Sequence, residues 1–415
     1  MKTLDVRLSG QPREILLGRL AQTREGIYFE YSREALAARL ELSPLKLPLA
    51  AGAKLGPASP FGGLHGLFND SLPDGFGALL LDRWIAIQGV DPRAATPLDR
   101  LAIIGSRGMG ALSYRPEQAP HQETVQWNLE EAEKQIQRVA HGETSTILPE
   151  LLQAGGSPQG ARAKLLVSLS ADMKTAVSGS GEVPRGFTAS IVKFATDPRS
   201  DSECRLEEAY ARMARAAGIR MPDTGFVDVG KGRVAFAAAR FDRRGNVRIH
   251  VQSASALLEI DHRVPSLDYD SLLRLARVLS RSQVQVEAMY RLAVFNVLAH
   301  NRDDHAKNFA FMQDAHGEWT VAPGYDLTFS QGPGGEHTTT VMGEGRTISV
   351  AQLEALGRQA SISPAVIAET VDRVREAISS FPSVARELGV PARAARQVTS
   401  VILPSGAGGK RGKGR

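Results

Sequence analysis

The polar segment Asn301–Asn308 constrains this chain more than any other feature of its sequence. Its residues read NRDDHAKN, and they directly follow an apolar run, Met289–Leu298, whose spacing predicts a buried helix that ends near His300. Within the segment, Asp303 and Asn308 lie five positions apart. A loop of this length can bring a carboxylate and an amide oxygen to one point.

The spacing of Asp303 and Asn308 matches the D-x-x-x-x-N of protein-kinase catalytic loops. In such a loop the aspartate faces the hydroxyl that attacks the γ-phosphate of ATP, and the asparagine oxygen faces the Mg²⁺ that shields the phosphates. The spacing alone is common by chance, and Asp303 and Asp304 could equally be cap or turn residues. For His305 we favour a structural hydrogen bond over metal ligation.

A second carboxylate for the metal is available at Asp326, which follows Asn308 by 18 residues. Between them, Phe309–Met312 and Glu318–Val321 can pair as a hairpin. Base, metal-binding asparagine, hairpin and metal-binding aspartate then follow one another in the order found in kinases. Taken alone, Asp326 could instead be a turn residue.

Two features upstream fit the same chemistry. Lys193 lies in the apolar strand segment Ser190–Phe194, where an ammonium group is costly unless it meets an anion such as the phosphates of ATP. Before it, Gly155–Lys164 is rich in small residues, including Gly160 and Ala161, which let backbone N–H groups approach phosphates. Alternatively, Lys193 could reach solvent from an edge strand, and the glycines could form an ordinary turn. The occurrence of the glycine-rich segment, the strand lysine, the catalytic loop and the metal-binding aspartate in this order is much less expected by chance than any one of these motifs.

Composition places the chain in the globular class. With 415 residues it is too long for one ordinary core, so we expect two or three domains. One cysteine, Cys204, rules out a disulfide framework within the chain. The sequence has no secretory signal pattern at its start and no apolar run long enough to span a membrane, so we expect a cytoplasmic protein without membrane contact. The net charge of +5 comes largely from the basic end, Lys410–Arg415, and is compatible with contact to nucleic acid or to acidic partners.

Local patterns predict an α+β chain with a sheet-rich part followed by a helix-rich part. Such an order suits a bilobal, protein-kinase-like enzyme preceded by a mixed α/β subdomain. Strands are predicted at 27–31, 165–169, 190–194 and 234–241, and helices at 33–36, 78–84, 129–139, 203–217 and 366–378. The predicted domains are 1–115, a kinase N-lobe at 128–245, a helical C-lobe at 246–400 and a basic disordered tail at 401–415, with a linker at about 116–127.

Several of these motifs resemble those of the HipA-like serine/threonine kinases, the toxins of bacterial type II toxin–antitoxin modules. Residues 303–309 resemble the family's D-x-H-A-K-N-F catalytic loop, and 325–327 its metal-binding Y-D-[IL]. Residues 191–194 resemble the strand of the ATP-binding lysine, and 240–243 the R-F-D-R of the hinge. Residues 68–75 are similar to the F-x-[DN]-x-L-P-[DE]-G signature of the N-terminal domain.

The resemblance implies a role for each matching residue. Asp303 would be the catalytic base, and Asn308 and Asp326 would hold Mg²⁺. Ser157 matches the glycine-loop serine whose autophosphorylation switches family members off, and a phosphate there would place negative charge where ATP phosphates bind. The remaining implied residues are Lys193, Gly160, Ala161 and the backbone near Ala239 and Phe241 for ATP, with His305, Lys307 and Glu207 in support.

The chain departs from the family pattern at two places. Ala239 stands where the hinge usually has glutamate, and residues 250–255 lack the acidic pair that usually follows the hinge. The glutamate that would pair with Lys193 is open between Glu203, Glu207 and Glu208, and we favour Glu207.

The resemblance implies a serine/threonine protein kinase that uses Mg²⁺ and ATP. In the family, known protein targets include aminoacyl-tRNA synthetases, and a cognate helix-turn-helix antitoxin would link the toxin indirectly to operator DNA. Two alternatives remain open from the sequence. The chain could be a weakly catalytic kinase-fold module that serves as antitoxin partner and corepressor, or a small-molecule kinase.

Overall fold

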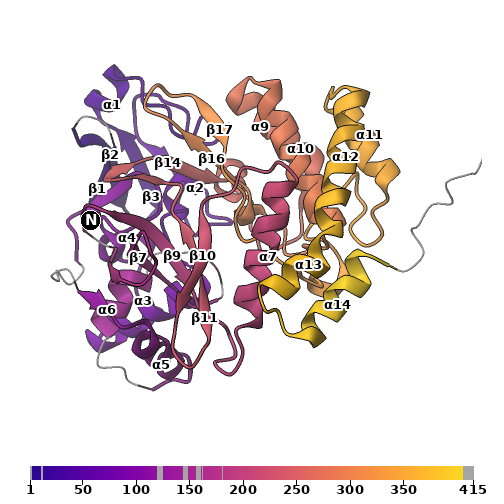
Figure 1. The fold of residues 1–415 in the computed structure, drawn as a ribbon. Coiled ribbons are helices and arrows are strands. Elements are labelled where there is room, and N and C mark those ends of the chain that lie inside the picture. The colour runs from indigo at the N-terminus through magenta and orange to yellow at the C-terminus, as the bar shows by residue number, and fades with distance from the viewer. Residues whose placement is uncertain are drawn as a thin grey trace, which may run out of the picture. The chain divides into compact units, whose positions relative to one another are not determined.

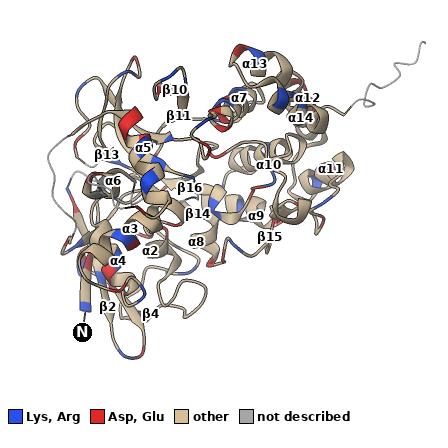
Figure 2. Ribbon diagram, turned by 90° about the horizontal axis from the view of Figure 1, so that it is seen from below, with Lys and Arg blue, Asp and Glu red and all other residues tan. Residues whose placement is uncertain are grey.

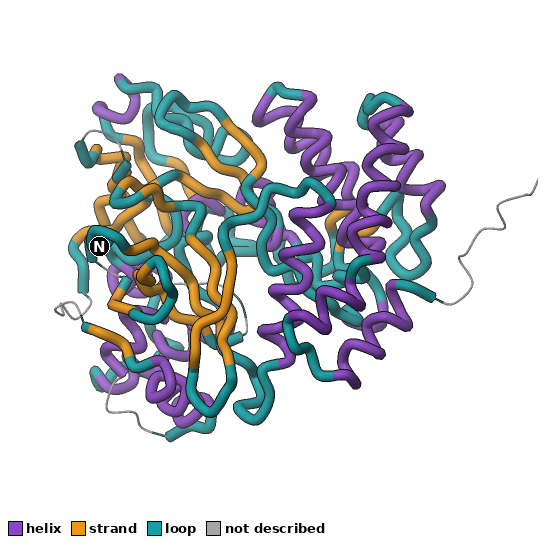
Figure 3. The backbone as a smooth tube through the Cα atoms, in the orientation of Figure 1, coloured by secondary structure: helices purple, strands orange, loops and turns teal. Residues whose placement is uncertain are grey.

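The computed structural model describes residues 2–10, 13–118, 125–143, 148–155, 160, 162–179 and 181–404. The chain divides into two compact units. Unit 1 comprises Met1–Asp201, Pro222–Arg263 and Ala306–Ala322. Unit 2 comprises Ser202–Met221, Val264–His305 and Pro323–Arg415. Strands dominate unit 1 and helices dominate unit 2, as the orange and purple segments of Figure 3 show.

The first sheet of unit 1 is antiparallel, with the strand order β4-β3-β2-β1-β5. Alternate residues of β1, including Leu4, Val6 and Leu8, point into its core, as the two-residue period of a half-buried strand requires. Short helices close this core. The elements are β1 Lys2–Leu8, β2 Ile15–Gln22, β3 Ile27–Tyr31, α1 Arg33–Ala37, β4 Lys54–Leu55, α2 Gly66–Asn69, α4 Pro97–Ile104 and β5 Leu112–Arg115.

The second sheet of unit 1 has the order β10-β11-β9-β7-β8-β6, and helices α3, α5 and α6 pack on it (Figure 1). Helix α5 has two acidic residues in its first turn and the basic Arg138 in its last turn, which suits the helix dipole (Figure 2). The elements are α3 Gly75–Ile87, β6 Gln126–Trp127, α5 Leu129–Ala140, α6 Leu148–Gly155, β7 Lys164–Ser170, β8 Ala176–Ser178, β9 Phe187–Lys193, β10 Thr224–Asp228 and β11 Val234–Ala239.

Two small sheets complete unit 1. One is the hairpin β12-β13, and the other has the order β14-β16-β17, in which the expected hairpin after Asn308 supplies two strands. Helix α8 packs against α2 and against the short 3₁₀ helix η1. The elements are β12 Arg243–Arg244, β13 Val247–Arg248, β14 His250–Ser253, α8 Ala254–Leu258, η1 Ala306–Asn308, β16 Ala310–Gln313 and β17 Trp319–Val321.

Unit 2 is built around the buried helix α10. Helices α9 and α12 pack on α10, and α12 and α13 also pack on α7 (Figure 1). The Tyr210 hydroxyl of α7 donates to the Ala299 carbonyl, 2.6 Å away, where α10 ends. The elements are α7 Ser202–Ala216, β15 Leu267–Asp268, α9 Tyr269–Ser280, α10 Gln283–Leu298, η2 Pro333–Gly335, β18 Thr339–Thr340, α11 Val350–Gln359, α12 Pro364–Ser379, α13 Phe381–Glu387 and α14 Ala392–Ile402.

The predicted strands and helices form, with shifted ends. The Ser32 side chain caps α1, and Gly218 follows α7 with a φ of +80°, as expected for a C′ residue. The predicted strand 234–241 is two residues too long, because β11 ends at Ala239. Among the described residues, no helix has the length and apolarity to cross a membrane.

Candidate active site

The polar segment Asn301–Asn308 is divided between the two units. Its first five residues, including Asp303, Asp304 and His305, belong to unit 2, and Ala306–Asn308 form η1 of unit 1. The predicted site residues therefore fall into two sets, and each set has its own surroundings.

In unit 2, Asp303 lies beside a second carboxylate. Its side chain is 60% exposed, and its Oδ1 lies 3.9 Å from Nε2 of His305. Partial burial raises the pKa of Asp303, and the negative charges of Asp326 and Asp304 raise it further, whereas His305 lowers it. The structure thus brings Asp303 and Asp326 within electrostatic reach of each other.

Asp326 is held in an unusual backbone conformation. Its φ is +56°, in the left-handed region that non-glycine residues seldom adopt. Just before it, the Gly324 amide donates to the Arg220 carbonyl, 2.7 Å away, and a Cβ on Gly324 would come within 2.8 Å of the Met221 sulfur. The close packing fixes the chain on one side of Asp326, and strain of this kind clusters at functional sites.

Asp304 is fully buried and has a different task from Asp303. Its carboxylate accepts hydrogen bonds of 2.8 Å from the Tyr269 hydroxyl, 2.8 Å from the Thr338 amide and 3.1 Å from the Thr339 amide. Nδ1 of His337 lies 2.8 Å from its Oδ2. Asp304 is therefore a structural acceptor, which distinguishes it from Asp303.

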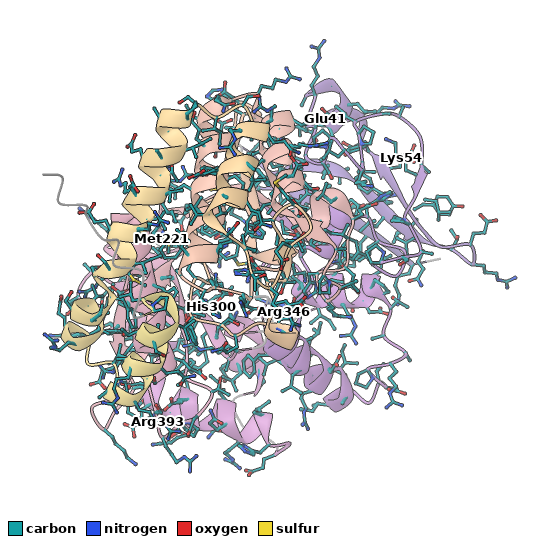
Figure 4. The ribbon with its side chains drawn as sticks, turned by 90° about the vertical axis from the view of Figure 1, so that its right-hand side faces the viewer. Glu41, Lys54, Met221, His300, Arg346 and Arg393 are labelled. Carbon is teal, nitrogen blue, oxygen red and sulfur yellow. The ribbon has the colours of Figure 1, made fainter. Side chains whose placement is uncertain are left out.

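Arg302 fixes the same segment through its side chain. Its guanidinium donates to the carbonyls of Gly335 and, at 2.9 Å, of Arg346. The Thr338 hydroxyl in turn donates to the Arg302 carbonyl, 3.2 Å away. Figure 4 labels Arg346 together with His300, which directly precedes the polar segment. The chain between 335 and 346 is thus tied to the residues on both sides of Asp303.

In unit 1, Lys193 is one of two buried lysines on neighbouring strands of the second sheet. Lys193 ends β9 and pairs with Lys164 of β7 on one side and Phe236 of β11 on the other. Directly opposed residues of antiparallel strands point to the same face. The two lysines are only 7% and 5% exposed, and Nζ of Lys193 lies 5.8 Å from the Phe236 ring centre. The two lysines concentrate positive charge on one face of the sheet.

Sequence reasoning missed Lys164. A signal was available, because Lys164 opens an apolar strand just as Lys193 closes one. Nζ of Lys164 lies so close to Gly160 that a Cβ there would come within 2.5 Å of it. Lys164 therefore lies beside the end of the glycine-rich segment. Two other predicted members of that segment, Ser157 and Ala161, lie outside the described residues.

Gly160 and Lys307 share a partner in unit 1, Asp74. The Gly160 amide donates to Oδ1 of Asp74, and Nζ of Lys307 lies 2.8 Å from its Oδ2. Nε2 of His262 lies 3.5 Å from the same oxygen. Burial alone would raise the pKa of Asp74, but Lys307, the Gly160 amide and His262 outweigh burial and lower it. Asp74 belongs to the 68–75 signature, but no role for its side chain was predicted from that motif.

A pocket of about 260 Å³ opens beside Asp74 and Lys307 in unit 1. Its wall mixes apolar and charged side chains, and its basic groups include Arg100 and Arg263. Asn308, next to Lys307 in η1, is half-buried and remains a predicted metal ligand. The lining residues are Pro60, Phe61, Asn69, Leu72, Pro73, Asp74, Leu81, Arg100, Asp261, His262, Arg263 and Lys307.

The hinge motif has side chains that serve the fold of unit 1. Asp242 is fully buried, and it accepts from Arg240 at 2.7 Å, from Arg243 at 2.7 Å and from the Gly110 amide at 2.7 Å. Arg248 donates to the carbonyls of residues 106, 108, 110 and 112, at 2.7 to 3.0 Å. The motif thereby holds the segment 106–112.

The adenine contacts predicted at Ala239 and Phe241 remain predictions. The Ala239 amide already donates to the Asp223 carbonyl at 2.8 Å. A hydrogen bond to adenine near this residue would therefore have to come from another backbone group. The departure at 250–255 has a structural use. His250 lies 3.2 Å from the Leu42 carbonyl, and Ser253 donates to Asp70 at 2.7 Å.

The three candidate glutamates lie on α7 in unit 2. Glu203 is exposed, and Glu208 pairs with Arg212 at 3.0 Å. Glu207 is buried. Because Glu207 is buried and Glu208 already pairs with Arg212, Glu207 is favoured as the partner of a cation. Its pairing with Lys193 remains a prediction.

The acidic residues fit a divalent cation that is shared with a phosphate. Burial and, to a smaller extent, the charge of Asp326 raise the pKa of Asp303, and a cation between the two carboxylates would offset their repulsion. Within the described residues, no cluster of three or more His, Cys, Asp or Glu side chains could hold a metal by itself. Mg²⁺ is commonly held by one or two carboxylates together with substrate phosphates, so the two observations are compatible.

Family models match most of the chain. A model of the HipA N-terminal domain matches residues 4–115, and a model of the HipA-like C-terminal domain matches residues 156–381, more than half of the chain. The chain belongs to the HipA family. The predicted resemblance is thereby confirmed.

A HipA chain of known structure has the same fold. It comes from the complex of the Shewanella oneidensis MR-1 toxin–antitoxin proteins HipA and HipB with their operator DNA, and it shares 20% identity and a TM-score of 0.70 over 96% of each chain. This match confirms the predicted α+β, kinase-like fold class. The Helicobacter pylori proinflammatory kinase CtkA matches 52% of this chain and 92% of its own at 12% identity, and its TM-score of 0.31 is too low to support an argument.

Proposed function

We propose that this HipA-family protein is a Mg²⁺- and ATP-dependent serine/threonine protein kinase that modifies a protein target in the cytoplasm, where ATP is available. The observation that carries the proposal is the pair of neighbouring carboxylates, Asp303 and Asp326, in unit 2. Pairs of acidic groups with a perturbed pKa are typical of catalytic sites. The family membership supports the same conclusion.

In this proposal Asp303 accepts the proton of the attacking hydroxyl. Its exposed carboxylate is accessible to a substrate, and its raised pKa makes it a better base than an ordinary aspartate. Asp304, buried in its own network, fixes the backbone that carries Asp303. His305 limits the rise in the pKa of Asp303.

Lys193 and Lys164 would neutralise the phosphates of ATP in unit 1. Both lysines are buried on one face of the sheet, where their positive charge would attract a highly charged anion. Asp326 and Asn308 would hold the metal, and Mg²⁺ would supply further neutralisation of phosphate charge when bound. Ser157 would be the site of autophosphorylation and Glu207 the partner of Lys193.

A DNA-binding antitoxin is the partner that we propose. The solved HipA that shares this fold was determined with HipB and operator DNA. We infer a corresponding small helix-turn-helix partner for this chain and contact with operator DNA through it. The identity of the protein substrate, for which an aminoacyl-tRNA synthetase is the family precedent, belongs to the same proposal.

Incubation of the purified protein with Mg-ATP, followed by intact and peptide mass spectrometry, tests the kinase. We expect one added phosphate on Ser157, and its loss in Asp303→Asn and in Asp326→Asn. Asp372→Asn, which removes an exposed carboxylate on α12, is the matched control and should behave as wild type.

The other outcomes separate the alternatives. ATP binding without phosphate on this chain or on added protein would overturn the kinase in favour of an antitoxin-binding module. Turnover of a small metabolite without protein phosphorylation would show a small-molecule kinase instead. Phosphorylation that persists in Asp303→Asn would contradict the role given to that residue.

A further inference from the structure

We propose that Asp74 is a positioning residue that ties the end of the glycine-rich segment and the lysine of the catalytic loop to helix α3. Its kinetic consequences rest on the proposed kinase function, but the structural link does not. All the residues concerned, Asp74, Gly160 and Lys307, belong to unit 1. Gly160 and Lys307 are 86 and 233 positions from Asp74 in sequence. A single carboxylate therefore joins three remote segments of the chain.

Gly160 is bound to the start of α3 by two hydrogen bonds. Its amide donates to Oδ1 of Asp74, and its carbonyl accepts from the Phe76 amide, 3.4 Å away. The φ of Gly160 is +101°, a conformation that a side chain would strain. The first amides of a helix lack partners within the helix, so the Gly160 carbonyl satisfies one of them.

Lys307 supplies the second link. Its ammonium lies 2.8 Å from Oδ2 of Asp74, and the lysine is only 7% exposed. A buried lysine needs an anion, and Asp74 provides one. Lys307 precedes Asn308 in η1, so Asp74 fixes the residue next to a predicted metal ligand.

The position of Asp74 on its helix supports a role beyond capping. Asp74 is the N-cap residue of α3, yet among the described residues its side chain makes no capping hydrogen bond to that helix. Its two oxygens instead face Gly160 and Lys307. Helix α3 is itself firmly held, because Phe76, Leu80 and Leu81 are buried in the core of the second sheet.

The neighbouring charges keep Asp74 ionised. Lys307 and His262 face it, and Asp261 lies 3.8 Å from the other ring nitrogen of His262. Asp74 binds Gly160 and Lys307, and we expect it to act through these two residues. We expect the Gly160 link to affect ATP affinity and the Lys307 link to affect turnover.

Three substitutions at Asp74 distinguish these links. Asn keeps an oxygen for the Gly160 amide but cannot neutralise Lys307, Ala removes both contacts, and Glu keeps the charge. Asp82→Asn is the matched control, because Asp82 lies on the same helix and pairs with Arg100 at 2.6 Å. Thermal melting establishes that each variant is folded.

Amide hydrogen exchange, measured by mass spectrometry on the full chain without nucleotide, tests the structural link. In Asp74→Ala, peptides that span Gly160 and Lys307 should exchange about 10-fold faster or more, and Asp82→Asn should leave both unchanged. In Asp74→Asn, the increase should be larger at Lys307 than at Gly160. Unchanged exchange at both peptides in folded Asp74→Ala would overturn the proposal.

Kinetics test the consequence. Asp74→Ala should raise KM for ATP and lower kcat, each by about 10-fold, whereas Asp74→Asn should mainly lower kcat, because small displacements of reacting groups are costly. Asp74→Glu should restore both constants most of the way. If wild type shows no phosphate transfer, the proposed function fails while the exchange result still decides the role of Asp74. If all variants keep wild-type constants, Asp74 is not a positioning residue.

Discussion

The two halves of the polar segment Asn301–Asn308 are anchored by carboxylates of different kinds, a buried one in unit 2 and a half-buried one in unit 1. In unit 2, Asp304 lies within the segment and is surrounded by a hydroxyl, two amides and an imidazole. In unit 1, Asp74 lies outside the segment and pairs with the ammonium of Lys307. The first anchor depends on many short hydrogen bonds, and the second depends on a pair of charges. They should therefore fail in different ways.

Asp304→Asn should have the largest effect on stability. The amide can accept through only one oxygen, so at least one of the buried donors from Tyr269, His337, Thr338 and Thr339 loses its partner. We expect a loss of about 3 to 5 kcal/mol in the free energy of unfolding, measured by urea denaturation. A loss below about 1 kcal/mol would show that the network is dispensable.

Asp74→Ala should follow, with a loss of about 2 to 4 kcal/mol at pH 7, because a buried lysine loses its partner. The pKa of Asp74 is lowered in the folded state, so its contribution is present above the pKa of the unfolded chain and is lost as the pH falls through the folded pKa. The difference from wild type should therefore shrink below about pH 4. Urea titrations across pH check this, and a difference independent of pH would contradict the charge-pair account.

Tyr269→Phe should weaken the first anchor by a smaller amount. The hydroxyl donates to Asp304 and accepts from Asn296 at 3.0 Å, so its removal should cost about 1 to 2 kcal/mol. A double-mutant cycle with Asp304→Asn should show coupling between the two sites. Tyr290→Phe, which removes one hydrogen bond to the Leu353 carbonyl, is the control and should show no coupling.

Asp303→Asn should have the smallest effect on stability, and its sign should be opposite. The raised pKa of Asp303 means that ionisation disfavours the folded state, so the variant should gain stability at pH 7 and lose that gain below about pH 4. The gain should stay below about 1 kcal/mol, because solvent screens an exposed carboxylate. Thermal melts at both pH values check the sign. Phosphate transfer should be abolished in the same variant.

The sequence predicted local elements well, because they depend on short-range patterns. The alternation at Ile27–Tyr31 became β3, and the apolar run before His300 became the end of α10. The spacing of Asp303 and Asn308 identified the segment to examine, and the family signatures identified the chain. The roles of Asp303, Asn308, Asp326 and Lys193 remain predictions that these patterns support.

Contacts between remote segments could not be predicted. Nothing near Asp74 in the sequence indicates Gly160 or Lys307, and Asp304 gives no sign of its bonds to residues 337–339. Only the strand register, which places Lys164 opposite Lys193, identifies Lys164 as a candidate site residue. The R-F-D-R motif was interpreted through its backbone alone, whereas its side chains hold residues 106–112.

The same side chains also limit which fragments of the protein can fold alone. Arg240 and Arg243 share Asp242, and Arg243 and Arg248 donate to carbonyl oxygens of residues 106–112. A truncated protein that starts after residue 115 would lack the carbonyl oxygens that accept hydrogen bonds from these guanidinium groups. We expect the remaining fragment to aggregate, so a minimal version of this protein should retain the first 115 residues.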